Sequence, residues 1–367
     1  MSSFIKPGRT VGILGGGQLG RFLSLSANKL GYKTFVYCPE NNCPASQVSD
    51  FNICKSYNDE QALTRFIENV DIVTFEFENL PISTLNYIEK KRPIRPRPTI
   101  LEIAQDRSKE KKFFMSIDAK TTEWVPVNTI DDLQHALNKL GYPSILKTSK
   151  SGYDGKGQFF ISSKEDITSS WKSITNEKDI SKLNKPFALL EKFVDFDLEI
   201  SVIVSRDLNG NIFTFEPTEN IHHNHILHKS IVPANISTKV KNNAIHIAKI
   251  AAAKLDLVGI MAIEMFVTQN EKIIINEMAP RPHNSGHWTL DASEPDQFTQ
   301  QIKCVCGHKT IEPIRKFDAT MINIIGDEIN NIKKLNITPD IKTYNYSKKT
   351  ALPNRKMGHI TTIKNIK

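Results

Sequence analysis

The chain has 367 residues, of which 39% are hydrophobic and 24% charged, and its formal net charge is +8 at pH 7. A chain of this length is too long to fold around one typical hydrophobic core, so two or three domains are predicted. The hydrophobic content excludes a disordered chain. The longest apolar stretches are strand-sized, which excludes a membrane-spanning helix, and the scattered Lys and Arg residues favour anionic small molecules over nucleic acid.

Cysteine usage and the first residues indicate a cytoplasmic protein. Five cysteines form no even framework of pairs, as is typical of a reducing compartment. Residues 1–10 are polar and lack the apolar core of a secretion signal. We therefore expect a cytoplasmic location.

The first hundred residues alternate between strands and helices. Strands are predicted at residues 10–14, 33–37 and 71–77, and helices at residues 18–30 and 59–69. Such alternation predicts a parallel α/β layer. The Pro- and Arg-rich sequence KKRPIRPRP at residues 90–98 is the first candidate boundary.

Glycines at positions 15, 17 and 20 follow the first strand in the spacing of a dinucleotide-binding turn. The NAD version requires an acidic residue at the end of the second strand. This chain has Tyr37-Cys38-Pro39 there, and Glu40 lies slightly late. We therefore expect no nicotinamide cofactor. Two interpretations stay open: a phosphate site at a helix N-terminus, and a tight turn without a ligand.

The central part of the chain predicts a mostly antiparallel sheet with covering helices. Helical patterns occur at residues 101–118, 131–140 (closed by Gly141), 240–255 and 296–306 (closed by Gly307). Strand patterns occur at residues 143–148, 158–162, 188–193, 198–205 and 212–216, with Asn209-Gly210 as a hairpin turn. From Thr310 onward, short strands and turns predict a small β unit.

A glycine- and lysine-rich loop joins two of these strands. Lys147, Lys150 and Lys156 accompany three glycines between residues 147 and 158. Backbone N–H groups without side chains beside them can approach a polyphosphate, although the spacing is not that of a P-loop. The alternative is an exposed hairpin in which Asp154-Gly155 only turns. The two glutamates of a predicted hairpin at residues 260–278, described below, favour the phosphate-binding interpretation of this loop.

The sequence Glu191-Lys192-Phe193-Val194 ends a strand before a short connection to Glu199. Such an edge offers backbone donors and acceptors to a purine ring, and Glu199 could meet ribose hydroxyls. Any strand end would look the same in the sequence.

Two apolar runs, at residues 260–268 and 272–278, flank a polar turn and predict a hairpin. If Asn270-Glu271 is a two-residue turn, Glu264 falls opposite Glu277. The residues expected to share their face are Ala262, Phe266, Ile273 and Ile275. Like charges about 5 Å apart repel by about 3 kcal/mol at an effective dielectric of about 20, and a bridging cation would reverse this sign.

Oxygen ligands of this kind suit magnesium, and Asn276 can add a neutral oxygen. The alternative is two solvent-exposed glutamates on an ordinary hairpin. The phosphate-binding features upstream favour the magnesium interpretation.

Two further groups contain potential transition-metal ligands: His222, His223, His225 and His228, and Cys304-x-Cys306-x-His308. Strand alternation is expected to place His223 and His225 on the face opposite the other two histidines. We therefore expect one nucleotide contact and several surface histidines. The two cysteines lie at a predicted helix end and are expected to be buried structural residues.

The ordered motifs resemble the ATP-grasp superfamily and, within it, the 5-(carboxyamino)imidazole ribonucleotide synthases of the PurK type. The resembling segments are GILGGGQLGR at 12–21, Gln105-Asp106-Arg107, SGYDGKGQ at 151–158, EKFVDFDLEISVIVSR at 191–206, ENIHHNHIL at 219–227, INEMAPRPHNSGHWT at 275–289 and NRKMGH at 354–359. They span nearly the whole chain in the order of the family. One departure is Phe22, which stands where a methionine is usual.

The resemblance implies an α/β fold, α+β overall. It divides the chain into a Rossmann-like domain at 1–98, an ATP-grasp domain at 99–308 with a mobile part at about 119–190, and a small C-terminal β domain at 309–367. The implied activity is ATP- and bicarbonate-dependent carboxylation of 5-aminoimidazole ribonucleotide through carboxyphosphate, in de novo purine biosynthesis, by a magnesium-dependent homodimer.

Two rival functions remain. One is another ATP-grasp ligase with a different acyl donor or acceptor. The other is a non-catalytic protein that binds nucleotides or nucleic acid. That interpretation does not explain why Glu264 and Glu277 face each other.

The resemblance also implies site residues. ATP contacts are expected at Arg107, Lys147, Gly152, Tyr153, Asp154, Gly155, Lys156, Gly157, Gln158, Glu191, Lys192, Phe193, Val194, Glu199, His222, Asn276 and Glu277. Magnesium is expected on Glu264 and Glu277. The ribonucleotide is expected at Glu76 (with Glu78 as the alternative), Tyr153, Asp154, Lys348, Arg355 and Lys356, and bicarbonate at Arg281, His283, Asn284 and Ser285. The expected catalytic residues are Arg281, His283, Asp154 and Lys356, with Asp154 and His283 as candidates for proton handling.

Overall fold

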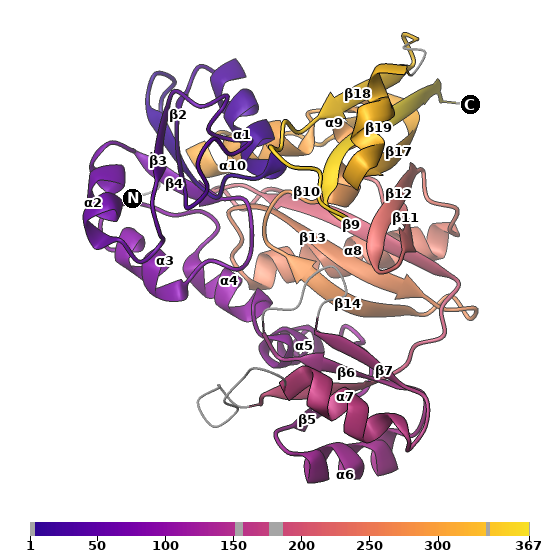
Figure 1. The fold of residues 1–367 in the computed structure, drawn as a ribbon. Coiled ribbons are helices and arrows are strands. Elements are labelled where there is room, and N and C mark those ends of the chain that lie inside the picture. Colours follow the sequence, from indigo (N-terminus) through magenta and orange to yellow (C-terminus); the bar gives the residue numbers. More distant parts are fainter. Residues whose placement is uncertain (1–3, 151–156, 176–185, 335–337, 367) are drawn as a thin grey trace.

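The computed structural model describes residues 4–150, 157–175, 186–334 and 338–366 (Figure 1). An N-terminal α/β domain lies beside a large sheet, and a small lobe lies below both. The C-terminal strands extend the large sheet on its far side. Within the described ranges, no helix has the length and apolar character needed to cross a membrane.

The N-terminal domain contains a parallel sheet in the order β3-β2-β1-β4, which confirms the predicted α/β layer. Its strands are β1 (Thr10–Leu14), β2 (Lys33–Cys38), β3 (Phe51–Cys54) and β4 (Ile72–Phe75). Its helices are α1 (Gln18–Lys29), α2 (Glu60–Glu68) and α3 (Ile82–Glu89). Helix α1 packs on one face of the sheet, and α2 and α3 pack on the other. Burial of both faces explains why the central strands are continuous apolar runs.

The small lobe contains an antiparallel sheet in the order β5-β8-β6-β7. Its elements are β5 (Trp124–Val127), α6 (Ile130–Leu140), β6 (Ser144–Thr148), β7 (Gln158–Ile161), α7 (Asp166–Thr175) and β8 (Ala188–Lys192). Helix α6 ends at Gly141, whose φ of 78° confirms the predicted stop. The lobe has its own core, including Leu133, Leu146 and Leu190. Movement of this lobe as a unit stays a prediction.

The large sheet has the order β14-β13-β9-β11-β12-β17-β19-β18, with β10 beside β9. Its strands are β9 (Leu198–Arg206), β10 (Ile212–Thr214), β11 (Thr218–His223), β12 (Ile226–Val232), β13 (Gly259–Val267), β14 (Ile273–Ala279), β17 (Phe317–Ile325), β18 (Ile341–Asn345) and β19 (Lys356–Asn365). Because β12 pairs with β17, the C-terminal strands continue the central sheet. A short two-stranded sheet of β15 (Ser293–Glu294) and β16 (Ile314–Arg315) lies apart from it.

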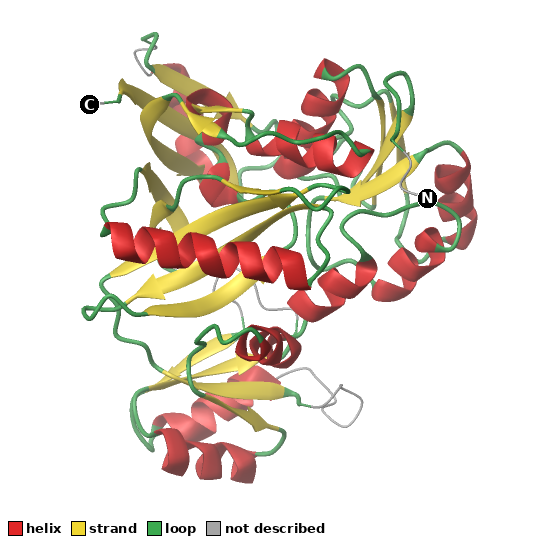
Figure 2. Ribbon diagram, turned by 180° about the vertical axis from the view of Figure 1, so that it is seen from behind, coloured by secondary structure: helices red, strands yellow, loops and turns green. Residues whose placement is uncertain are grey.

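Helix α8 (Thr238–Lys254) crosses one face of the large sheet, as Figure 2 shows from behind. Its alanines, including Ala244, Ala248 and Ala251, pack on β9 and β13. The opposite face carries Trp288 and the short helix η2 (Asn284–Gly286). That opposite face also carries the predicted acidic pair.

The predicted helical stretch at 101–118 forms two helices, α4 (Pro98–Ala104) and α5 (Arg107–Ser116). The break lies at Asp106, whose carboxylate accepts hydrogen bonds from the backbone N–H groups of Ser108 and Lys109 and caps α5. The remaining helices are α9 (Thr289–Ala292), α10 (Gln297–Cys306) and η3 (Gly326–Lys334). Helix α10 ends at Gly307 in the left-handed conformation, as predicted.

Candidate active site

The acidic hairpin consists of β13 and β14, and Glu264 lies directly opposite Glu277, as predicted. The route to this register differs from the prediction. Thr268 and Lys272 close the turn by a backbone hydrogen bond of 3.0 Å, so the turn contains three residues and not two. Asn276 is an extra residue in β14, because Glu264 pairs with Glu277 while the next residue of β13 pairs with Ile275. The bulge restores the pairing of the two carboxylates.

The bulge also changes which side chains share a face. Ile273 and Ile275 pair with Val267 and Met265 and lie in the core under α8. Their predicted position on the face of the glutamates is therefore wrong. Ile274 takes that place opposite Phe266, since the inserted residue reverses the alternation.

The two opposed carboxylates repel each other. Burial and repulsion by Glu277 raise the pKa of Glu264 to about 7. Arg107 lies 3.3 Å from Glu277, measured from Nη1 to Oε2. Behind this pair, the buried Glu110 accepts a 2.6 Å hydrogen bond from the backbone of Met278, and burial followed by repulsion from Glu277 raises its pKa to about 8. Two carboxylates and a neighbouring amide form a donor set of oxygen atoms that fits a hard divalent cation.

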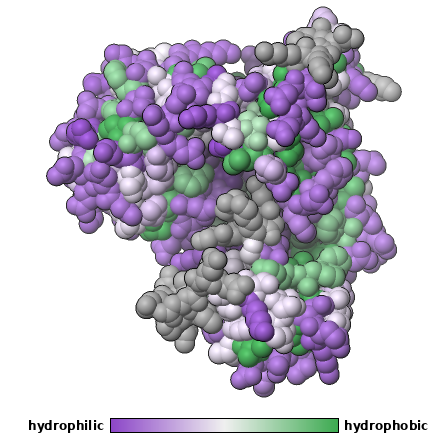
Figure 3. All heavy atoms as spheres, viewed as in Figure 1, coloured by the Kyte–Doolittle hydropathy of each residue, from purple (hydrophilic) through white to green (hydrophobic). Residues whose placement is uncertain are grey.

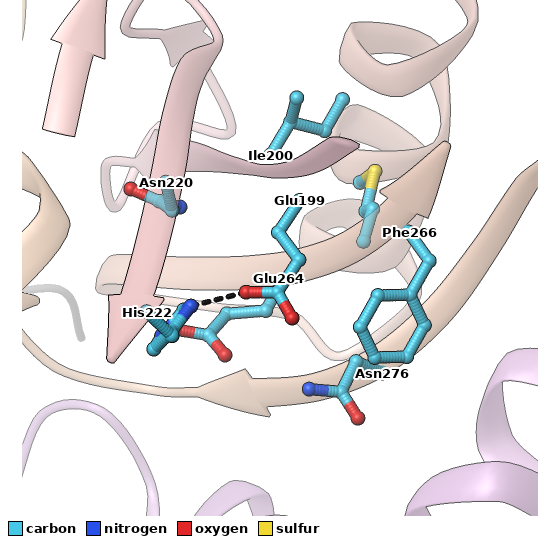
Figure 4. Close-up of a pocket in the computed structure, with 8 residues that line it drawn as sticks. Glu199, Ile200, Asn220, His222, Glu264, Phe266 and Asn276 are labelled. Atoms are coloured by element: carbon cyan, nitrogen blue, oxygen red, sulfur yellow. Dashed lines mark ion pairs between the residues drawn. The ribbon is translucent and has the colours of Figure 1, made fainter. Parts of the chain in front are cut away.

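A small cavity opens beside Glu264 (Figure 4). Glu199, His222 and Asn276 line it together with residues of β13, and an ion pair joins His222 to Glu199. Burial opposes the protonation of His222, but Glu199 outweighs it and raises the pKa of this histidine. Three predicted nucleotide contacts thus lie together.

The histidine cluster differs from the prediction in one respect. The rings of His223 and His228 stack at a centroid distance of 4.4 Å, so they do not lie on opposite faces. A register shift between Ile221 and His222 and a turn at Asn224 interrupt the expected alternation. Within the described ranges, no group of three or more His, Cys, Asp or Glu residues is arranged to hold a metal ion. Cys304 and Cys306 are fully buried, as predicted.

A second charge cluster lies where strands β6 and β8 of the small lobe meet α5. Glu191 on β8 receives Lys147 at 2.8 Å and Lys111 at 3.1 Å, and all three side chains are buried. Burial alone would raise the pKa of Glu191, but the two lysines lower it to about 2. Burial lowers the pKa of Lys147, and Glu191 opposes this effect. The cluster carries a surplus of positive charge, which suits a polyphosphate.

Some of the remaining residues expected to contact ATP lie within the described ranges and others do not. Gly152, Tyr153, Asp154, Gly155 and Lys156 lie outside the described residues. Gly157 has a φ of 71°, and a Cβ there would meet Thr148 Oγ1 at 2.7 Å, so only glycine fits. Phe193 is 39% exposed and packs edge-on against Phe160 at 5.6 Å. Figure 3 shows hydrophobic surface where the small lobe meets the rest of the molecule.

Arg281 follows β14 and is held by Glu78 through an ion pair from its Nε atom. Burial disfavours the charged form of Arg281, but Glu78 outweighs it and raises the pKa of this guanidinium. Glu78 has a lowered pKa, because Arg281 overcomes the effect of burial on it. The interaction orients Arg281 across 203 residues of sequence.

The residues after Arg281 contact the acidic pair. His283 Nε2 lies 3.2 Å from Glu264 Oε1, and His283 Nδ1 lies 2.8 Å from Ser285 Oγ. Ser285 is fully buried, and its expected contact with bicarbonate stays a prediction. Asn284 is also buried, and neither polar atom of its amide has a hydrogen-bond partner within the described part of the chain. A buried amide without a partner is unusual, so contact of Asn284 with bicarbonate stays a prediction.

The glycine-rich turn of the N-terminal domain is occupied by a side chain of the protein. Glu76 accepts hydrogen bonds from the backbone N–H groups of Gly17 at 2.8 Å and Gly20 at 3.3 Å. Burial raises the pKa of Glu76 against the effect of these donors. Since a carboxylate already fills the place of a phosphate, the structure supports a tight turn without a phosphate ligand.

The expected 5′-phosphate ligands lie near Glu76. Lys348 donates a 2.7 Å hydrogen bond to the backbone oxygen of Lys356, and burial followed by the neighbouring Arg355 lowers its pKa to about 8. Lys356 also acts electrostatically on Glu78, Glu264 and His283. Lys348 acts on Glu76 and Lys356 acts on Glu78 and Glu264, whereas Arg355 lies 3.9 Å from Glu40.

Sequence reasoning missed three residues that support this site. They are Glu110, Lys111 and Ser201. The first two lie on the buried face of α5, beside the expected Arg107. The available signal was the spacing of Arg107 and Lys111, four residues apart on one helix face.

Three family matches cover the chain in order. They are the ribonucleotide synthetase preATP-grasp domain at 8–105, the ATP-grasp domain at 112–298 and the phosphoribosylaminoimidazole carboxylase C-terminal domain at 319–367. The N5-carboxyaminoimidazole ribonucleotide synthase of Bacillus subtilis (strain 168) is 40% identical over 365 residues, covering 98% of this chain and 93% of that protein. The chain belongs to this PurK-type family of the ATP-grasp superfamily.

Solved structures of N5-carboxyaminoimidazole ribonucleotide synthases and a further relative are also similar to this chain. An ADP complex of such an enzyme has a TM-score of 0.94 at 40% identity and covers 100% of this chain and 95% of that chain. A complex from Aspergillus clavatus with ADP and 5-aminoimidazole ribonucleotide has a TM-score of 0.87 at 28% identity, covering 97% and 94%. The bifunctional purine synthesis protein purC/E of Dictyostelium discoideum is 40% identical over 97% of this chain, which spans 37% of that protein.

Proposed function

We propose that this protein is an ATP-dependent carbon–nitrogen ligase that carboxylates the amino group of 5-aminoimidazole ribonucleotide with bicarbonate. The product is N5-carboxyaminoimidazole ribonucleotide, formed through carboxyphosphate in de novo purine (IMP) biosynthesis. The single observation that carries the proposal is the opposed pair Glu264 and Glu277 between two cationic groups. Family membership and the names of the relatives support it.

The two cationic groups suit the two anionic substrates. Lys147, with Lys111 behind it, carries the positive surplus beside the glycine-rich loop and would bind the phosphates of ATP. The oxygen donors of Glu264 and Glu277, with Asn276 adjacent, fit magnesium. Magnesium bound there supplies positive charge that neutralises the transferring phosphoryl group.

Bicarbonate is a poor electrophile and is activated by accepting the γ-phosphoryl group of ATP. Arg281, oriented by Glu78, would hold this anion, and the unpartnered amide of Asn284 would add hydrogen bonds. Carboxyphosphate hydrolyses readily, so water would have to be excluded from the site during transfer to the amine. Lys348, Arg355 and Lys356 would bind the 5′-phosphate of the ribonucleotide.

Dependence on each substrate tests the proposal. ADP release is measured with magnesium and ATP while bicarbonate and 5-aminoimidazole ribonucleotide are each withheld, and labelled bicarbonate is followed into an acid-labile product. We expect turnover to require the ribonucleotide. Turnover indifferent to both additions would overturn the assignment and point to another acyl donor or acceptor.

Arg281→Ala provides a second test of the same proposal. This change should abolish labelled product, because the anion then lacks its fixed guanidinium. Arg97→Ala, which removes an exposed ion pair with Asp256, is a matched control and should keep full activity. Normal carboxylation by Arg281→Ala would remove this residue from the mechanism.

We also infer a cytoplasmic location and a homodimeric state. All five cysteines are free, which suits a reducing compartment. The homodimer rests on the family resemblance alone. Sedimentation equilibrium of the purified protein tests it, and a monomer at micromolar concentration would contradict it.

A further inference from the structure

A row of polar side chains crosses the large sheet on the face of the acidic pair. Glu264 on β13 lies opposite Ser201 on β9, and Asn220 on β11 lies opposite Ser230 on β12. Ser201 is 2% exposed, Asn220 5% and Ser230 0%. Buried polar groups destabilise a core unless they are hydrogen-bonded, so a complete set of partners is expected here.

The hydrogen bonds of this row run in one direction. Ser230 Oγ donates to Asn220 Oδ1 at 2.9 Å, which directs Asn220 Nδ2 to Ser201 Oγ at 3.0 Å. Since Ser201 accepts from Asn220, its own proton goes to Ser285 Oγ at 2.7 Å. Ser285 in turn lies 2.8 Å from His283 Nδ1 and has one proton to donate. Each donor therefore points toward His283.

Two further contacts at His283 agree with this direction. The backbone N–H of Ser285 also approaches Nδ1, at 3.4 Å, which requires Nδ1 to be an acceptor. On the other side of the ring, Nε2 lies 3.2 Å from Glu264 Oε1, where a proton on Nε2 can be donated to this oxygen.

We infer that the series of hydrogen bonds through Ser230, Asn220, Ser201 and Ser285 fixes the tautomer of His283. In this tautomer the neutral ring carries its proton on Nε2. His283 then donates a hydrogen bond to Glu264 and orients this carboxylate. Ser201 and Asn220 are positioning residues that act through His283. In this arrangement Nε2 is not free to accept a proton, so His283 does not act as the general base.

The consequence for metal binding rests on the proposed function, in which Glu264 is a magnesium ligand. Groups that orient a metal ligand typically change metal affinity about 10- to 100-fold when they are removed. The tautomer itself does not depend on that proposal. The two can therefore fail separately.

Nitrogen NMR of the imidazole rings tests the tautomer in metal-free protein. With ¹⁵N-labelled histidine, and with His283→Gln to assign the signal, we expect the Nε2–H tautomer at His283. Asn220→Asp removes the amide donor while keeping the shape of the side chain. It should reverse the direction of the hydrogen bonds, so that the ring proton of His283 moves from Nε2 to Nδ1. An Nδ1–H tautomer in the unmodified protein would overturn the inference, whatever the activity is.

Calorimetric magnesium titration in the presence of ADP tests the consequence. We expect Ser201→Ala to raise the Kd for magnesium about 10-fold and Ser201→Thr, which keeps the hydroxyl, to restore it. Ser205→Ala is the matched control, because Ser205 lies on the same strand and is equally buried. Its side-chain hydrogen bonds within the described residues join it to Phe213 and Gln300, which are not part of the row. Equal effects of Ser201→Ala and Ser205→Ala would show a merely structural role and contradict the inference.

Discussion

Two charge groups of the site are built on opposite principles. Around Glu191, one carboxylate is paired with Lys147 and Lys111, and their attraction overcomes burial so that its pKa is lowered to about 2. Between β13 and β14, two carboxylates face each other, and burial with mutual repulsion raises the pKa of Glu264 to about 7. The fold completes the first group with its own side chains. We propose that a bound cation completes the second.

The largest expected effect concerns the incomplete group. Glu277→Gln should lower turnover about 100-fold or more while the fold persists, because a carboxylate that would face the cation is lost. ADP release with all substrates measures this. Glu271→Gln is a matched control at the turn of the same hairpin, where the carboxylate has a surface partner, Lys239, at 3.8 Å. Activity of Glu277→Gln close to that of the control would defeat the magnesium assignment.

Neutralising one glutamate in each group should change the free energy of unfolding in different directions. Glu191→Gln leaves two buried lysines without a counter-charge and should lower the free energy of unfolding by about 3–5 kcal/mol. Glu264→Gln relieves repulsion, so the metal-free protein should be unchanged or more stable. Urea unfolding in the presence of a chelator measures both. Similar losses in the two variants would show that the groups are not built differently.

The smallest expected effect is a pH dependence of the metal-free protein. The folded-state pKa of Glu264, about 7, is above its ordinary 4.5, so its contribution to stability is present below pH 4.5 and is lost as the pH rises through 7. The slope is at most about 1.4 kcal/mol per pH unit for one group. Glu191 behaves in the opposite way: its contribution is present above pH 4.5 and is lost as the pH falls towards 2.

Unfolding midpoints between pH 5 and 8 test this dependence. Glu264→Gln should reduce the slope of the decline over this range, and the part that remains is expected from Glu110, whose pKa is raised to about 8. Added magnesium should reduce the decline in the unmodified protein. A decline of the same slope in Glu264→Gln would assign the pH dependence to another group.

Much of this site was predictable because local patterns carry it. Alternation in two apolar runs placed Glu264 opposite Glu277, and the glycines at 141 and 307 marked helix ends. These predictions need only the period of a strand or the geometry of a helix end. The turn length and the bulge at Asn276 were missed, and their two errors of one residue cancelled at the carboxylates but not at Ile273 and Ile275.

The sequence by itself determined the family, the order of the domains and the acidic pair, since these follow from motifs and from contacts within one hairpin. Only the tertiary structure decided which partners surround them. Glu76 fills a glycine turn 59 residues away, and Ser201 joins Asn220 to the segment after β14. No local period encodes such contacts, because they depend on which strands become neighbours and on which polar groups burial then forces to find a partner.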